Sequence, residues 1–247
     1  MPLAPLAPNA WLRWDVVRGV LPKERVSLLE VGCGQGAFGS RLATMYDYTG
    51  VEPDPVAHAA AVAAVGAAGN TGRVVNGDVS SLGAGRTFDV VCAFEVLEHI
   101  EDDEKALAQW VERVRPGGLV VLSTPAWQSR FGPWDSAVGH FRRYDPDVMR
   151  ERLRGAGLVD VGVRCFGAPL GFVLEAARDR LASHRTELRE EKPIEARTAR
   201  SGRLYQPSSG LQGALTQVGT FPFRLVQRAF PGRGTGLVAW GRRALPD

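Results

Sequence analysis

A glycine-rich segment holds the first residues whose types and spacing suit chemistry. It reads Glu30-Val31-Gly32-Cys33-Gly34-Gln35-Gly36. Glycines between a strand and a helix let the backbone approach a ligand closely and leave amide groups free to donate hydrogen bonds. Gly34, Gly36 and Gly39 also satisfy GxGxxG, and Glu52 follows 18 positions after Gly34, near where a dinucleotide fold places its ribose acid. The loop therefore predicts a nucleotide-containing ligand without deciding its class.

The segments around this loop alternate between strands and helices. Apolar runs predict strands at 26–31, 48–52, 73–76, 88–94 and 119–123, with helices at 37–45, 55–65 and 102–114. Continuous apolar strands joined by helices are typical of a parallel sheet that is covered on both faces. The expected fold class is therefore α/β, with a doubly wound, mostly parallel sheet.

Flanking segments complete one predicted domain, 1–247. A helix at 9–20, capped by Asn9, precedes the core, and a loop at 126–144, a helix at 146–156 and strands at 159–166 and 236–241 follow it. The core thus comprises 26–166 and 236–247. Residues 167–235 form a helical insertion before the last strand, with helices at 170–191 and 222–230 and a Gly/Ser-rich link at 201–213.

Five segments in chain order resemble the motifs of the class I S-adenosylmethionine-dependent methyltransferases. They are Glu30-x-Gly32-x-Gly34-x-Gly36, Tyr48–Asp54, Asn76–Val79, Phe88–His99 and Leu119–Pro125. The segment Gly139–Tyr144 resembles, more weakly, a bacterial subgroup close to the quinone O-methyltransferases. The resemblance implies a seven-stranded, Rossmann-like methyltransferase fold, S-adenosylmethionine as the cofactor, S-adenosylhomocysteine as its product, and a small-molecule acceptor.

The same resemblance implies a cofactor site at the carboxyl ends of the strands. Its expected members are Glu30, Gly32, Cys33, Gly34, Gly36, Glu52, Pro53, Asp78, Val79, Phe94 and Glu95. Glu52 would accept from both ribose hydroxyls, Asp78 from the adenine amino group, and Glu30 would support the ammonium group. Glu52 as a turn acid and Asp78 as a helix or turn cap remain the local alternatives.

The acceptor side is expected in the loop after the fifth strand. His140 is the candidate base for a hydroxyl, and a structural lid residue is the alternative. The expected substrate contacts are Trp14, His99, Arg142, Arg143 and Tyr144. For some of these a structural interpretation stays open: core packing for Trp14, and pairing of the arginines with Asp145 and Asp147.

Metal binding is weighed and not expected. Asp135 with His140 offers two ligands for Mg²⁺ without a further cluster to support them. Glu95, Glu98 and His99 also suggest metal binding or acid–base chemistry, but Glu98 and His99 are interpreted as residues that begin a loop and cap the helix at 102–114. His58 and His184 are interpreted as surface residues.

Composition excludes several classes of protein. The 247-residue chain is 45% hydrophobic and 23% charged, which is ordinary for a globular protein, and no apolar run reaches the roughly 18 residues that span a bilayer. Residues 1–9 lack the features of a secretory signal. Cys33, Cys92 and Cys165 lie far apart, so we expect reduced thiols and a cytoplasmic protein. A net charge of +3 with dispersed basic residues does not indicate nucleic-acid binding.

One basic amphipathic stretch, 219–230, lies in the insertion. It is a candidate contact with a membrane surface or a lipidic acceptor, and a lid or homodimer contact is the favoured interpretation.

For the whole chain, O-methylation of a small molecule is expected, with N- or C-methylation open. Two other classes of protein are alternatives. One is a NAD-dependent oxidoreductase, which should carry a proton relay such as a Tyr/Lys pair, and the other is a non-catalytic cofactor-binding subunit.

Overall fold

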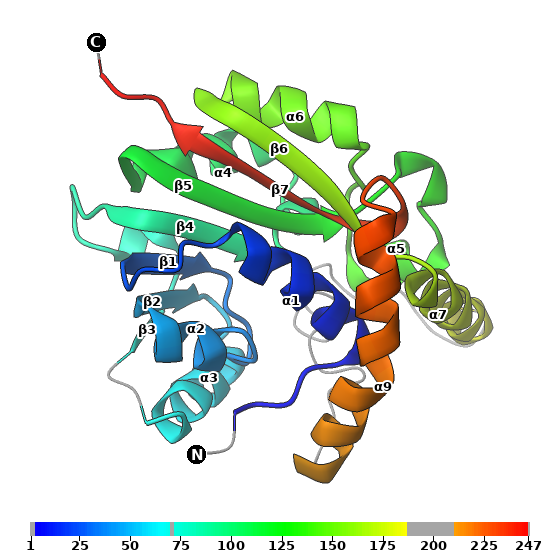
Figure 1. Ribbon diagram of the computed structural model, residues 1–247. Helices are drawn as coiled ribbons and strands as arrows, with labels where there is room; N and C mark the ends of the chain where they lie inside the picture. Colours follow the sequence, from blue (N-terminus) through cyan, green and yellow to red (C-terminus); the bar gives the residue numbers. More distant parts are fainter. Residues whose placement is uncertain (1–2, 70–71, 187–209, 247) are drawn as a thin grey trace.

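The computed structural model describes residues 3–69, 72–186 and 210–246. Its centre is a seven-stranded sheet in the order β3-β2-β1-β4-β5-β7-β6 (Figure 1). The strands are β1 (Ser27–Val31), β2 (Asp47–Glu52), β3 (Arg73–Asn76), β4 (Phe88–Phe94), β5 (Val114–Pro125), β6 (Leu158–Gly167) and β7 (Gly234–Arg243). Strands β1 to β5 are parallel, and β7 runs antiparallel to both β5 and β6. The expected doubly wound, mostly parallel sheet is confirmed.

Helices cover both faces of the sheet. They are α1 (Pro8–Val20), α2 (Gly39–Met45), α3 (Pro55–Ala67), α4 (Asp103–Glu112), α5 (Pro133–Val138), α6 (Pro146–Gly155), α7 (Leu170–Thr186) and α9 (Gly210–Ala229). One core packs side chains of α1, α2 and α3 against the sheet, and the other packs those of α4 and α6. Burial of these apolar side chains on both faces is the main stabilising term.

The parallel register brings the loops after β1 to β5 to one edge of the sheet. Val31 lies beside Val51 and Ala93, Glu52 beside Asn76, and Phe94 beside Ser123. We call this the carboxyl edge, because all five strands end there. Open α/β sheets bind ligands at this edge.

Several predicted boundaries are wrong by a few residues. Helix α1 begins at Pro8 after Ala7, so Asn9 is not its cap; proline is well suited to the first helical position, where an N–H is not needed. Helix α4 ends at Glu112 and β5 starts at Val114, five residues before the predicted strand. The ladder with β4 is interrupted between Val114 and Leu119, so the segment around Gly117 is an irregularity inside a strand.

The predicted insertion has more helix than expected. Helix α9 begins at Gly210, twelve residues before Pro222, so the proline lies inside a helix and does not start one. Packing on α1 offsets the backbone bond that proline cannot make: Gln227 donates to Leu12 O at 2.9 Å and Arg228 pairs with Asp15. Figure 1 shows α9 alongside α1. Residues 187–191 of the predicted first helix and 201–209 of the predicted link lie outside the described residues.

Two further features concern the helices. The expected loop at 126–144 contains helix α5. Among the described helices, none combines the length and the apolar character that crossing a membrane requires.

Candidate cofactor and acceptor site

The glycine loop after β1 is fixed on one side and open on the other. Gly34 and Gly36 have φ of +55° and +77°, where residues with a Cβ are strained. A Cβ at Gly36 would lie 2.9 Å from Ala61 Cα, so this glycine lets the loop pack on α3. A Cβ at Gly34 would meet no described atom within 4 Å. Gly34 is therefore the place in the loop where a ligand can approach the backbone.

Glu52 at the end of β2 holds this loop in position. Its carboxylate accepts from the amide of Gly34 at 2.8 Å and from that of Asp54 at 3.0 Å. Burial raises the pKa of Glu52, and the two amide hydrogen bonds act in the opposite direction. Pro53, which follows, is exposed and starts the turn into α3, whose N-terminus Asp54 caps.

Glu30 lies beneath the loop and is almost fully buried. The Tyr48 hydroxyl donates to Glu30 Oε2 at 2.7 Å. Burial raises the pKa of Glu30 to about 8, although the Tyr48 hydrogen bond and the charge of Arg13 lower it. Cys33 is a buried free thiol next to this carboxyl group, and its pKa is raised by burial and by the charge of Glu30. A cationic group that reached Glu30 would stabilise the carboxylate form.

Asp78 follows β3 and caps a short helix, which is the local alternative given for it above. Its Oδ1 accepts from the amide and the hydroxyl of Ser80, so it caps the short 3-10 helix Val79–Ser81. These hydrogen bonds lower the pKa of Asp78. The side chain is exposed at the carboxyl edge, whereas Val79 is buried. Capping does not use both carboxylate oxygens, so the geometry leaves room for a second partner.

The end of β4 carries an aromatic contact and an acid. Phe94 packs edge-on against Phe38, which packs edge-on against Trp14, with ring centroids 5.1 and 5.0 Å apart. Trp14 is buried in this core cluster, as the packing interpretation of its helical spacing predicts. Glu95 has φ of +58°, and its Oε1 is 2.9 Å from an Arg13 guanidinium nitrogen and accepts from the Ser123 hydroxyl.

His140 is held by a buried carboxylate. Its Nδ1 lies 2.7 Å from Asp135 Oδ1, and Arg143 binds Asp135 through several hydrogen bonds. Burial alone would raise the pKa of Asp135, but the hydrogen bonds from His140 and Arg143 bring it to about 2. Because Asp135 stays ionised, the shared proton belongs on Nδ1, which leaves Nε2 of the neutral ring as an acceptor.

The arginines pair with other acids than Asp145 and Asp147, the partners that the structural interpretation expected. Arg143 is buried and pairs with Asp135 and, at 3.2 Å, with Glu175 of α7, not with Asp145 or Asp147. Its role in the described residues is to position Asp135, and thereby His140.

Asp103 organises the neighbouring residues of this loop. Arg142 lies 2.7 Å from Asp103 Oδ1, and the Tyr144 hydroxyl donates to Asp103 Oδ2 at 2.7 Å. Tyr144 is fully buried, and burial together with the Asp103 hydrogen bond raises its pKa. Direct substrate contact by Arg142, Arg143 and Tyr144 is not tested by these contacts and stays a prediction.

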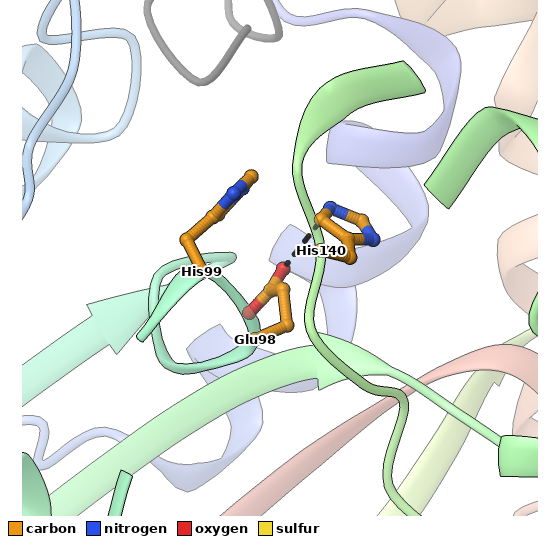
Figure 2. Close-up of side chains that lie close together, drawn as sticks. All are labelled: Glu98, His99 and His140. Carbon is orange, nitrogen blue, oxygen red and sulfur yellow. Dashed lines mark ion pairs between the residues drawn. The ribbon is translucent and has the colours of Figure 1, made fainter. Parts of the chain in front are cut away.

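Glu98 and His99 are not caps of α4, which is capped by Asp102. They project from the turn after β4 and meet His140 from the segment after α5, as Figure 2 shows. One ligand atom from each of the three lies within 4.8 Å of the others. Burial, with the charge of Glu95, raises the pKa of Glu98 well above its usual range, and burial with the neighbouring His140 lowers the pKa of His99 to about 4. Figure 2 shows the Glu98 carboxylate directed toward His140.

Sequence reasoning missed the partners that hold these groups. Arg13 on α1, Asp103 on α4 and Glu175 on α7 reach the site from elements far apart in the chain. A sequence signal existed only for Glu98, which stands three residues after Glu95 and therefore returns to the same edge. His58 is half-buried, with Nε2 3.3 Å from Val74 O, and is not simply a surface residue.

Comparison with known proteins identifies the family. Residues 13–163, more than half of the chain, match the family described as "Methyltransferase domain". An uncharacterized methyltransferase from Mycobacterium sp. (strain JLS) is 35% identical over 131 residues, 52% of this chain and 50% of that protein. A ubiquinone biosynthesis O-methyltransferase from Azorhizobium caulinodans is 36% identical over 109 residues, 43% of each chain.

A solved structure supports the same fold. Phosphoethanolamine N-methyltransferase 2 from Haemonchus contortus, in complex with S-adenosyl-L-methionine, has a TM-score of 0.60 at 16% identity, covering 98% of this chain and 54% of that one. The chain belongs to the methyltransferase domain family and has the class I S-adenosylmethionine-dependent methyltransferase fold. It spans about half the length of the curated relatives that it matches.

Proposed function

We propose that this protein transfers a methyl group from S-adenosylmethionine to a hydroxyl of a small molecule. The observation that carries the proposal is the carboxyl edge itself, where an open Gly34 backbone, the buried Glu30 carboxyl and the fixed Glu52 carboxylate lie together. These groups match a ligand that has a sugar at one end and an ammonium at the other.

The residues of this chain fit the cofactor by the chemistry of their donors and acceptors. Glu52 would accept from the ribose hydroxyls through the lone pairs that Gly34 and Asp54 leave free, and Asp78 from the adenine amino group. Glu30 would face the ammonium group. Cys33, Gly32, Pro53, Val79, Phe94 and Glu95 complete the proposed cofactor contacts. The bound cofactor supplies a methyl group on a positively charged sulfur.

His140 is proposed to take the proton of the acceptor hydroxyl. Asp135 keeps its Nδ1 protonated, and Nε2 is available. As the methyl group moves from the sulfur of the bound cofactor to the acceptor oxygen, His140 Nε2 would accept the hydroxyl proton. Positioning supplies much of the acceleration, and a base contributes mainly when the hydroxyl is weakly acidic.

The choice of oxygen rests on two observations. The segment Gly139–Tyr144 resembles that of quinone O-methyltransferases, and ubiquinone biosynthesis O-methyltransferases are among the relatives. Nitrogen is the second candidate, because a neighbour in fold is named as an N-methyltransferase. A nicotinamide oxidoreductase is disfavoured: of the three lysines, Lys23 and Lys105 are exposed and Lys192 lies outside the described residues, so no described Tyr/Lys relay stands at the edge.

Location and partners belong to the proposal as well. The cysteines are free and buried, which accords with a cytoplasmic protein. The side chains of Leu215, Val218 and Phe221 on α9 are exposed. This face supports the proposed contact of the insertion with a lipidic acceptor, a membrane surface or a second copy of the chain.

Replacing His140 by Ala tests the acceptor side. We expect the rate of methyl transfer to fall by about 10²–10⁴-fold, because a positioned proton acceptor is lost, while the affinity for S-adenosylhomocysteine stays the same. The measurement is transfer of labelled methyl to a panel of phenols and catechols, with calorimetry on the same samples. Lys105→Ala, an exposed substitution on α4, is the control and should keep the wild-type rate. A wild-type rate in His140→Ala would remove this residue from the reaction.

A further inference from the structure

Glu98 is a buried acid that has no role in the reaction proposed above. The residue is fully buried, and neither carboxylate oxygen has a hydrogen-bond partner within the described part of the chain. The Nε2 atom of His140 lies 4.0 Å from Oε1 of Glu98, which is too long for a hydrogen bond. A buried carboxylate without a partner is strongly unfavourable. Something must therefore satisfy it.

Polar atoms of two histidines lie close to the Glu98 carboxylate. His99 Nδ1 is also buried without a hydrogen-bond partner among the described residues. The rings of His99 and His140 meet edge-on with centroids 4.6 Å apart, and the side chain of His140 is only 8% exposed. With one ligand atom each from Glu98, His99 and His140 inside 4.8 Å, a single bound ion would satisfy all three groups together.

The groups behind this cluster prepare it for a cation. Asp135 accepts the proton of His140 Nδ1, which fixes the ring and leaves Nε2 with its lone pair toward Glu98. A histidine that ligates a metal typically donates its other N–H to a carboxylate in this way. Arg143 in turn holds Asp135 and Glu175, so the carboxylate behind His140 is itself fixed. Asp135 is thus a positioning residue and not a ligand.

We propose that Glu98, His99 and His140 form a divalent-cation site beside the methyl-donor site. Two imidazoles and one carboxylate favour first-row transition metals such as Mn²⁺, Fe²⁺ or Zn²⁺ over Mg²⁺. Three protein ligands leave coordination positions open, as metal sites that act on substrates do. Arg13 and Ser123 hold Oε1 of the neighbouring Glu95, so the proposed ligands are the three side chains that lie together, Glu98, His99 and His140.

The site deepens the proposed function and rests on it for its substrate class. Open positions on a divalent cation suit an acceptor with two neighbouring oxygen atoms, such as a catechol, and a cation lowers the pKa of a hydroxyl that it binds. With a cation bound, His140 Nε2 would be a ligand and not the base proposed above. The cation would favour the ionised hydroxyl, whose proton would pass to water. The favoured acceptor is a diol-bearing aromatic compound.

Direct binding of Mn²⁺ is the first test. Tag-free protein is stripped with a chelator, and MnCl₂ is titrated while the electron paramagnetic resonance signal of free Mn²⁺ is followed. We expect one ion per chain, displaced by Zn²⁺ and not by excess Mg²⁺. An absence of Mn²⁺ and Zn²⁺ binding by the wild-type protein overturns the proposal and assigns a proton to Glu98 instead.

Matched variants locate the ion. Glu98→Gln and His99→Gln should each weaken Mn²⁺ binding by about 100-fold, and Asp135→Asn by about 10–100-fold. Glu101→Gln, which changes an exposed acid three residues away, should bind as the wild type. Metal-free Glu98→Gln should melt at or above the wild-type temperature, since a neutral amide replaces a buried carboxyl group that has no hydrogen-bond partner among the described residues. Full Mn²⁺ binding by both Glu98→Gln and His99→Gln would place the ion elsewhere and contradict the proposal.

The same samples separate this proposal from the proposed function. S-adenosylhomocysteine is titrated with and without Mn²⁺, and we expect it to bind in both cases. Binding of the nucleoside without any cation binding would refute the metal site alone, whereas cation binding without nucleoside binding would refute the methyltransferase function. A catechol methylation rate that is unchanged by the chelator would also contradict the role of the ion.

Discussion

Glu52 holds the glycine loop in the fold and is also the proposed partner of the cofactor's sugar. Its carboxylate accepts the amides of Gly34 and Asp54, and so ties the glycine loop to the turn after β2 before any ligand is present. Each oxygen keeps a further lone pair for a hydroxyl. The local interpretation of this residue and the functional one are therefore compatible.

Replacing Glu52 by Ala should weaken S-adenosylhomocysteine binding by about 1–3 kcal/mol, because charged hydrogen bonds to the sugar are lost. The melting temperature should also fall, since two backbone amides lose their acceptor. Calorimetry measures the first effect and thermal unfolding the second. Glu24→Ala removes an exposed acid and serves as the control. Wild-type affinity in Glu52→Ala would exclude this residue from the cofactor site.

Residues near one another in the chain were predictable, and their distant partners were not. The acids and glycines at the carboxyl edge follow from strand ends that the sequence pattern locates. The contacts of Arg143 with Asp135 and Glu175 depend on how α5 and α7 pack, which no local pattern encodes. For the same reason Glu98 and His99 were interpreted as caps, whereas Glu98 is buried and His99 half-buried beside His140.

The loop between β1 and α2 contains two glycines whose surroundings differ. Gly36 is pressed against α3, and Gly34 faces open space. Both have positive φ, so an alanine costs about 1–2 kcal/mol at either position.

Gly36→Ala should lower the free energy of unfolding by about 1–3 kcal/mol more than Gly34→Ala, because its Cβ also collides with the backbone of Ala61. Gly34→Ala should instead show the larger relative loss of S-adenosylhomocysteine affinity, since its methyl group enters the open side of the loop. Urea unfolding and calorimetry of the two variants give the comparison. Equal stability losses, or a larger one at Gly34, would contradict the assigned packing.

The element pattern itself was largely predictable. Buried parallel strands are largely apolar runs, so β4 was located to the residue. The edge strand β3 was located equally well, although it is only partly buried. Helix α9 was not, because Pro222 reads as a helix start while packing on α1 sustains helix on both sides of it. Tertiary contacts here override a local preference.

At the scale of the whole molecule, the ligand site lowers the stability of the ligand-free fold. Glu30 has a pKa of about 8 in the folded chain and an ordinary value of 4.5. Between these values the folded protein holds a proton that the unfolded chain releases. Stability should therefore fall as the pH rises from about 4.5 to 8, by at most about 1.4 kcal/mol per pH unit from this group.

Glu30→Gln should flatten that dependence, because a neutral amide replaces the titrating carboxyl. Urea unfolding of ligand-free protein at several pH values from 5 to 8 measures the difference between the two chains. Glu112→Gln, an exposed substitution, should retain the wild-type slope. Parallel curves for wild type and Glu30→Gln would show that the burial of Glu30 does not govern the stability of the fold.

The central claim is that the carboxyl edge binds a sulfonium nucleoside. Side-by-side calorimetric titrations of the full chain with S-adenosylhomocysteine and with NAD⁺ test it most directly. The account predicts binding of one S-adenosylhomocysteine per chain, weakened in Glu52→Ala, and no heat from NAD⁺. Saturable NAD⁺ binding in a protein that ignores S-adenosylhomocysteine would contradict it.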